Sequence, residues 1–449
     1  NILDDFFAVR SKEGIMSVPE KLLKFNNGLK RVFVFGSLFH AQALFLSSVY
    51  ALGLTGAVRG TLPKVLGGSK GKLGTVEWFK LQLGTEEFYN LADVAVKHGL
   101  QVVNIKKSEL VNPGKPDIDP ILDALGPAGQ MAKGAFGALD KVTWEWMHDR
   151  FKLAAYIRHK EKAMAKGLDE DTAGRRAAIF ANDAFGSLDW NGFSTKLIEY
   201  AAANPTKFRG KLADYTSKFM PADKRRWLNL FMFAPDWTTS NIRIVGKAFS
   251  GAPEASKAFY KKVFEGKNWE SDPKAQEILA AWQMYGSYTL RAGMYTSALW
   301  WAITSAFSDN EPTMDGLWDF WFGENSGKLD LGNGEGMVIS KQLAEPIHWI
   351  QHPQHTLSNK GAIIPKTALE AFYNKQWFSL KKGMPLGPRI IDEDGTNHMG
   401  KWILGKALPI GIKPLFDGDL SNEEKLKRTG LGLIGFPQYG KEPEKTKYY

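Results

Sequence analysis

Three histidines in the last third of the chain have the spacing of a metal site. His348, His352 and His355 lie at positions i, i+4 and i+7, which would bring three imidazoles to one face of a helix. Imidazole nitrogens are common ligands of zinc, so this pattern could hold a divalent metal. Pro353 interrupts such a helix, and no carboxylate follows at a matching spacing. We therefore interpret the three histidines as loop or packing residues and predict no metal site.

Two further patterns could support catalysis or phosphate binding. Glu145 and Asp149 lie four residues apart and could form an acid–base pair, but exposed carboxylates on helices commonly have this spacing. Residues 332–336 (GNGEG) connect two predicted strands, whereas a phosphate-binding loop leads from a strand into a helix. The acidic residues 169–171 are expected to favour the start of the following helix. We predict no catalytic residue and no cofactor, and expect that the chain is not an enzyme.

Basic clusters beside aromatic residues are the strongest candidates for a binding function. Arginine and lysine neutralise phosphates and aromatic rings stack on bases, so such clusters suit a nucleic-acid backbone. The opposing interpretation is that they are solvated helix faces of an ordinary basic protein. No helix-turn-helix or zinc-finger pattern is present, so binding without sequence preference is expected. The predicted nucleic-acid-binding residues are Lys207, Arg209, Lys224, Arg225, Arg226, Lys257, Lys261 and Lys262.

The positive charge of the chain is concentrated in its middle. The formal net charge is +10, and residues 141–267 hold 23 Lys and Arg against 14 Asp and Glu. This balance favours an anionic partner, either nucleic acid or acidic lipid. Cysteine is absent, which excludes disulfides, thiolate metal sites and cysteine nucleophiles.

Residues 32–58 form a stretch of 27 residues without a formally charged side chain. As one continuous helix it would be about 40 Å long, which is enough to cross a bilayer. Hydroxyl, imidazole and amide groups inside it are costly in hydrocarbon, so we favour a helix buried in protein over a membrane span. One half of this helix would carry small and polar residues that suit either membrane insertion or close helix packing. The candidates for that role are Gly36, His40, Ala43, Ser47 and Ala51.

The elements that must position these residues are mostly helices. The predicted fold class is all-α, with an irregular C-terminal third and a small β-hairpin near residues 329–339. Residues 1–140 are expected to form an N-terminal helical region, residues 141–308 a basic helical domain, and residues 309–449 an irregular region rich in glycine and proline. A second uncharged run, residues 292–308, is short for a membrane span and is interpreted as a buried helix.

Several segments together resemble one family pattern. They are Phe151-Lys152 with Tyr156, residues 167–173 (GLDEDTA), residues 181–190 (ANDAFGSLDW), residues 233–241 (FAPDWTTSN), residues 357–360 (LSNK) with Pro365, and Pro385-Leu386. The pattern resembles the helical C-terminal regions of very long proteins of tailed, short-tailed bacteriophages. These are internal virion or DNA-ejection proteins, and the large polyvalent proteins that share similar helical modules. The resemblance covers about residues 140–400.

The resemblance implies a protein packed inside the capsid near the portal and expelled into the host with the genome. Its implied partners are other internal virion proteins, the portal, copies of itself, DNA bound without sequence preference, and the host inner membrane. It would move from the virion interior to the host cell envelope and help to build a conduit for DNA there. The alternative is an accessory helical module of a polyvalent protein that acts in the host cell beside a linked enzyme. A constitutive membrane protein is a third, less favoured hypothesis.

Overall fold

The computed structural model describes residues 39–61, 86–102, 147–187, 190–218, 239–249, 273–308, 311–323, 327–332, 335–339, 344–351, 370, 372–379, 384–391, 393, 421–433 and 438–439. This part of the chain is predominantly helical, which confirms the predicted fold class. Its helices are α3 (Phe39–Leu52), α4 (Leu54–Thr61), α6 (Glu86–Lys97), α9 (Asp149–Met164), α10 (Glu170–Ala184), α11 (Trp190–Ala203), α12 (Phe208–Ser217), α15 (Pro273–Phe307), α16 (Met314–Phe322), α17 (Ala344–Gln351) and α21 (Asn422–Leu433). Its strands are β1 (Lys328–Gly332), β2 (Glu335–Val338), β3 (Lys375–Ser379), β4 (Met384–Arg389) and β5 (Gln438–Tyr439).

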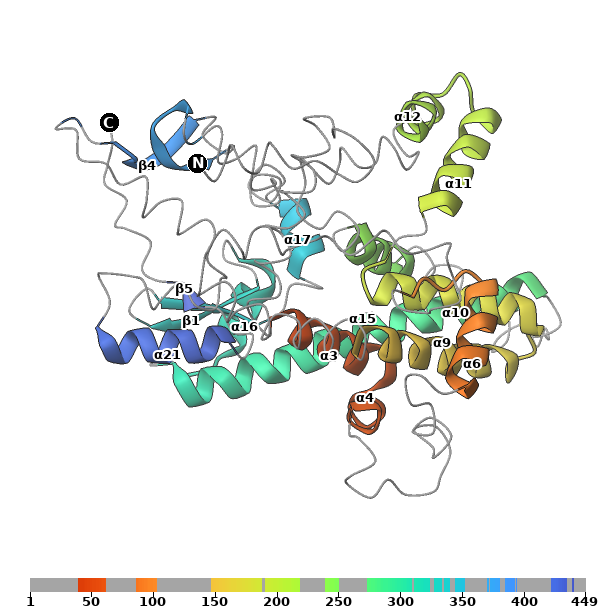
Figure 1. Cartoon of the computed structure of the whole chain (residues 1–449), viewed down its shortest axis with the longest axis horizontal. Coiled ribbons are helices and arrows are strands. Elements are labelled where there is room, and N and C mark those ends of the chain that lie inside the picture. Colours follow the sequence, from red (N-terminus) through yellow and green to blue (C-terminus); the bar gives the residue numbers. More distant parts are fainter. Residues whose placement is uncertain are drawn as a thin grey trace, which may run out of the picture.

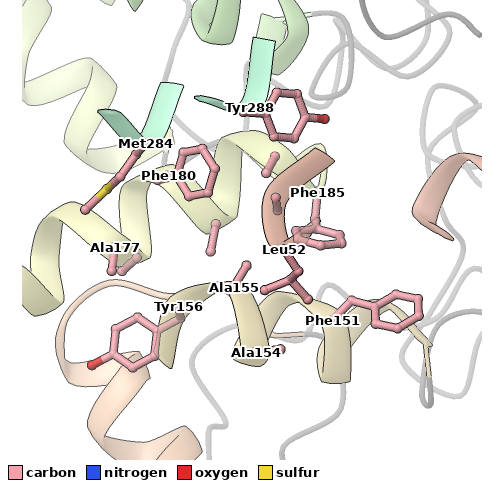
Figure 2. Close-up of a cluster of buried hydrophobic side chains, with 14 of the residues drawn as sticks. Leu52, Phe151, Ala154, Ala155, Tyr156, Ala177, Phe180, Phe185, Met284 and Tyr288 are labelled. Atoms are coloured by element: carbon pink, nitrogen blue, oxygen red, sulfur yellow. The ribbon is translucent and has the colours of Figure 1, made fainter. Parts of the chain in front are cut away.

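The main core lies where α3, α9 and α10 pack against one another and along α15 (Figure 1). Alanines at four-residue spacing on α10, namely Ala173, Ala177 and Ala181, are fully buried and let α9 approach closely. Phe180 is also fully buried, and Figure 2 shows its ring beside Met284 and Tyr288 of α15. Burying a phenylalanine of this kind contributes about 2–3 kcal/mol, so this ring is a main link between α10 and α15.

A second, smaller core joins the end of α15 to a sheet. Trp300 of α15 and Phe320 of α16 pack with Leu329, Met337 and Ile339. The strands β1 and β2 pair antiparallel with Leu329 opposite Met337, so the predicted hairpin is confirmed. Strand β5 pairs with β2 to complete a three-stranded sheet, and β3 and β4 form a separate antiparallel pair.

The expected role of residues 169–171 at the start of a helix is confirmed. Asp169 is the N-cap of α10, and its carboxylate accepts a hydrogen bond from the Thr172 backbone N–H at 2.9 Å. Gly167 follows α9 with φ +94°, a left-handed conformation that glycine adopts without steric cost. Gly99 follows α6 in the same way, with φ +95°. Gly167 and Asp169 together set the short turn that brings α10 back along α9.

The continuous helix expected over residues 32–58 is wrong. Helix α3 ends at Leu52, Gly53 adopts φ +78°, and α4 begins at Leu54. A left-handed residue ends the hydrogen-bonded ladder of a helix, which the lack of charge in the sequence does not reveal. Residues 32–38 lie outside the described residues. Among the helices described, none combines the length and the apolar content that crossing a bilayer requires.

The cores cross the predicted regional boundaries. The main core includes Leu44 and Leu100 from the first region together with Phe151 and Tyr288 from the second. The second uncharged run belongs to α15, where Ala292, Thr296, Trp300 and Thr304 are buried on one face. On the opposite face Met294 and Trp301 are exposed, so this helix is buried along one side only.

Candidate functional site

The C-terminal end of α3 is held by side chains from two other helices. His159 of α9 donates from Nε2 to the Ala51 carbonyl oxygen at 3.1 Å, and Arg291 of α15 donates from Nη1 to the same oxygen at 3.1 Å. Arg158 of α9 donates to the Leu52 carbonyl oxygen. The last carbonyls of a helix carry partial negative charge, so cationic donors satisfy them well. We call this bend between α3 and α4 the elbow.

Burial controls the protonation of the elbow. Burial lowers the pKa of His159 to about 3; its hydrogen bond to Ala51 opposes this shift, and the charges of Lys162, Arg291 and Arg158 add to it. His159 is therefore neutral at physiological pH and acts only as a hydrogen-bond donor. Burial also lowers the pKa of Arg158 and of Arg291 below the usual value, although both remain cationic.

Four cations gather beside the elbow, namely Arg158, Lys162, Lys166 and Arg291, and we call them the elbow cation group. Arg158, Lys162 and Lys166 follow one another at four-residue steps along α9 and just past its end, so they share one side. Burial lowers the pKa of Lys162, and the nearby charges of Arg158, Arg291 and Lys166 lower it further. Within the described residues, none of the four forms a salt bridge with a carboxylate. Such an arrangement can attract an anion.

A buried carboxylate joins three helical segments on another side of α10. Asp183 is 1% exposed; it accepts from Lys247 Nζ and from the Tyr285 hydroxyl, each at 2.8 Å, and lies 3.3 Å from Arg243. Lys247 also donates to the Tyr285 hydroxyl at 2.8 Å. Burial, followed by the charge of Asp183, raises the pKa of Tyr285 well above its usual value. The tyrosine therefore stays protonated and fixes the carboxylate, which is a structural role.

A shallow hollow lies beside a histidine that connects α6, α9 and α10. The His98 Nδ1 lies 2.6 Å from the Tyr156 hydroxyl, and Nε2 lies 3.3 Å from the Asp171 carboxylate. The hollow, of about 200 Å³, is lined by Val94, Lys97, His98, Asp171 and Arg175. The Tyr–His–Asp chain resembles a proton relay in composition, but Tyr156 is 2% exposed and does not line the hollow. We therefore interpret it as a packing contact.

Asn182 ties α10 to the segment that follows α6. Its side-chain amide donates from Nδ2 to the Gly99 carbonyl oxygen at 2.8 Å, and its Oδ1 accepts from the Gln101 backbone N–H at 2.9 Å. Both bonds are partly buried and join the segment after α6 to α10. The asparagine in the ANDAF pattern therefore has a structural function in this fold.

The predicted nucleic-acid-binding residues are only partly described. Lys207 is exposed in the turn before α12, and Arg209 lies within α12. Lys224, Arg225, Arg226, Lys257, Lys261 and Lys262 lie outside the described residues. Of the residues named from the sequence, Ala51 lies at the elbow, where its carbonyl oxygen accepts a hydrogen bond from Arg291.

The other predicted residues take packing positions or fall outside the description. Ser47 and Ala51 are fully buried in α3, Ala43 is half-buried, His40 lies in the first turn of α3, and Gly36 is outside the described residues. Asp149 is buried, with its carboxylate 3.0 Å from His148 Nδ1. His348 lies in α17, whereas Glu145, His352 and His355 are outside the described residues. In the described ranges, no three His, Asp or Glu side chains are arranged to hold a metal ion.

Sequence reasoning missed the elbow cation group. The four-residue spacing of Arg158, Lys162 and Lys166 within a predicted helix is a readable signal, but it lacks the adjacent aromatic residues that singled out the other clusters. Arg291 comes from 125 positions beyond Lys166, so only the fold reveals its contribution.

Comparison with known proteins adds no relative. No protein-family model, no curated protein and no solved structure matches this chain.

Proposed function

We propose that this chain is a non-enzymatic internal virion protein of a tailed bacteriophage, packed near the portal and delivered into the host with the genome. It would assemble with copies of itself and with other internal proteins, and its basic surface would contact DNA without sequence preference. After ejection it would help to form a conduit for DNA across the host envelope.

The observation that carries this proposal is the position of the residues on which the family resemblance depends. Asp169 caps α10, Asn182 and Asp183 fix its neighbours, and Phe185 is buried beside His148. These residues maintain a helical fold and do not gather as an exposed set of reactive groups. Because these residues stabilise the fold, they support a resemblance to a structural helical module. A non-enzymatic virion protein would contain a module of this kind.

Quantitative mass spectrometry of purified, nuclease-treated phage particles tests the proposal. We expect a small, fixed number of copies of this chain for each portal ring. Absence from particles, together with presence in infected cells, would contradict it and favour the accessory module of a polyvalent protein. A copy number that varied with purification would identify a contaminant and contradict it equally.

A further inference from the structure

We infer that the elbow cation group is a binding site for the sugar–phosphate backbone of double-stranded DNA. The site consists of Arg158, Lys162, Lys166 and Arg291, none of which belongs to the basic clusters recognised in the sequence. The phosphate-binding chemistry follows from the geometry, while the choice of DNA over other polyanions rests on the proposed function.

The elbow cation group keeps a net positive charge within the part of the chain that the structure describes. Glu161 also lies on this part of α9, so the five side chains together still sum to a formal charge of +3. Other cations of the same region are paired: Lys160 lies 2.6 Å from Glu170, and Arg176 forms a salt bridge with Glu277. Cations that crowd one another in a half-buried place raise the free energy of the folded state, and a bound anion would lower it.

Two of the cations, Arg158 and Arg291, are already held in place by hydrogen bonds. Arg291 donates to the Ser287 carbonyl and hydroxyl oxygens at 2.9 and 2.8 Å as well as to Ala51, and Arg158 is fixed on Leu52. A side chain that is ordered before binding loses less conformational entropy when it meets a phosphate. A guanidinium presents five N–H donors, so those not engaged by the elbow remain for a ligand.

The group is accessible from solvent, and three of its members form a row along α9 and just past its end. Lys162 and Lys166 are exposed, while Arg158 and Arg291 are half-buried behind them. Successive four-residue steps along a helix advance about 6 Å, and duplex DNA carries a phosphate charge for about every 1.7 Å of its axis. A row of cations along α9 can therefore meet successive phosphates of one groove edge without reading any base.

The experiment compares two double variants of the full-length chain with matched charge. Lys162→Gln/Lys166→Gln removes the exposed half of the group, and Lys97→Gln/Lys425→Gln removes the same charge from α6 and α21. Affinity for a labelled duplex of about 30 base pairs is measured by fluorescence anisotropy between about 50 and 200 mM NaCl. None of the four lysines forms a salt bridge in the described residues, so both variants should keep the wild-type fold. Circular dichroism checks this expectation.

The expected result is a change in salt dependence at the elbow alone. Each phosphate contact contributes about 0.9 to the slope of log affinity against log salt, so losing two contacts lowers the slope by about 1.8. Over the stated salt range the wild type should then lose about tenfold more affinity than the elbow variant. The α6/α21 variant should keep the wild-type slope.

Two outcomes would overturn the inference. If both double variants keep the wild-type slope, or both lose it equally, the elbow has no special role in binding DNA. If the elbow variant binds DNA normally but no longer sediments with phosphatidylglycerol vesicles, the occupant is a lipid headgroup and the assignment to DNA is wrong. Either result leaves the particle count by mass spectrometry unaffected, so failure here is distinguishable from failure of the proposed virion role.

Discussion

The Arg291 side chain donates a hydrogen bond to the Ala51 carbonyl oxygen at 3.1 Å, across 240 positions of sequence. This bond joins the long helix α15 to the end of α3, in the middle of the stretch that lacks charged residues. His159 reaches the same oxygen from α9. The end of the uncharged helix is therefore a polar junction inside the protein, and several consequences can be measured.

Stability should fall in mild acid because His159 is buried in its neutral form. Its pKa of about 3 in the folded state lies below the ordinary value of 6.5, so the unfolded state binds a proton first as the pH falls. The stabilising effect is present above about pH 6.5 and is lost progressively toward pH 3. We expect the free energy of unfolding to drop by about 2 kcal/mol between about pH 7 and pH 5, measured by urea denaturation.

The variant His159→Gln isolates this contribution. Glutamine can donate to the Ala51 carbonyl oxygen but does not titrate, so the drop between the two pH values should shrink by about 2 kcal/mol relative to the wild type. An equal drop in both proteins would show that other groups cause the acid sensitivity.

Asp183→Asn should destabilise the bundle. The substitution removes the charge that Lys247 and Arg243 face, and it weakens the hydrogen bond from Tyr285. Because both cations remain partly exposed to water, we expect a loss of about 2 kcal/mol, less than for a fully buried pair. The control is Asp214→Asn, whose partner Lys218 is exposed, and which should change the unfolding free energy by less than about 0.5 kcal/mol. Similar losses in the two variants would argue against the Asp183 network.

Gly174→Ala should disturb the contact between α6 and α10. A Cβ at this position would lie 2.4 Å from His98 Nδ1, so the imidazole must move and its hydrogen bond to Tyr156 must break. We expect a loss of about 1–3 kcal/mol, as for other overpacked positions. Gly293→Ala on α15 meets nothing within 4 Å and should instead stabilise by about 0.5–1 kcal/mol. Chemical denaturation of both variants checks the opposite signs, and a stabilised Gly174→Ala would contradict the observed packing.

Asn182→Ala should destabilise the protein because it removes two hydrogen bonds between α10 and the segment after α6. The substitution leaves the Gly99 carbonyl and the Gln101 N–H without their side-chain partner in a half-buried place. We expect the unfolding free energy to fall by about 2–3 kcal/mol, with faster hydrogen exchange at Gln101. The comparison is Asn204→Ala, whose amide donates to an exposed carbonyl of Tyr200 and should matter much less. Unchanged exchange at Gln101 would show that the bond to Asn182 does not protect it.

The helical class, several helix ends and one hairpin follow from local features of the amino-acid sequence. These features depend on neighbours in the chain: Asp169 caps the helix that begins beside it, and Gly167 and Gly99 end helices because glycine adopts positive φ freely. The hairpin over residues 328–338 likewise follows from alternation and an Asn-Gly turn. Local physical chemistry is sufficient for such predictions.

The position of the break in the uncharged stretch, and the side chains around it, depend on tertiary contacts. Gly36, Gly53 and Gly56 all lie in that stretch, and nothing local distinguishes the one that adopts φ +78°. The carbonyl oxygens of Ala51 and Leu52 at the break accept hydrogen bonds from the side chains of Arg158, His159 and Arg291. These three residues lie more than 100 positions away in the sequence. The elbow cation group arises in the same way, because electrostatic and hydrogen-bonding partners are set by distance in space and not by spacing along the chain.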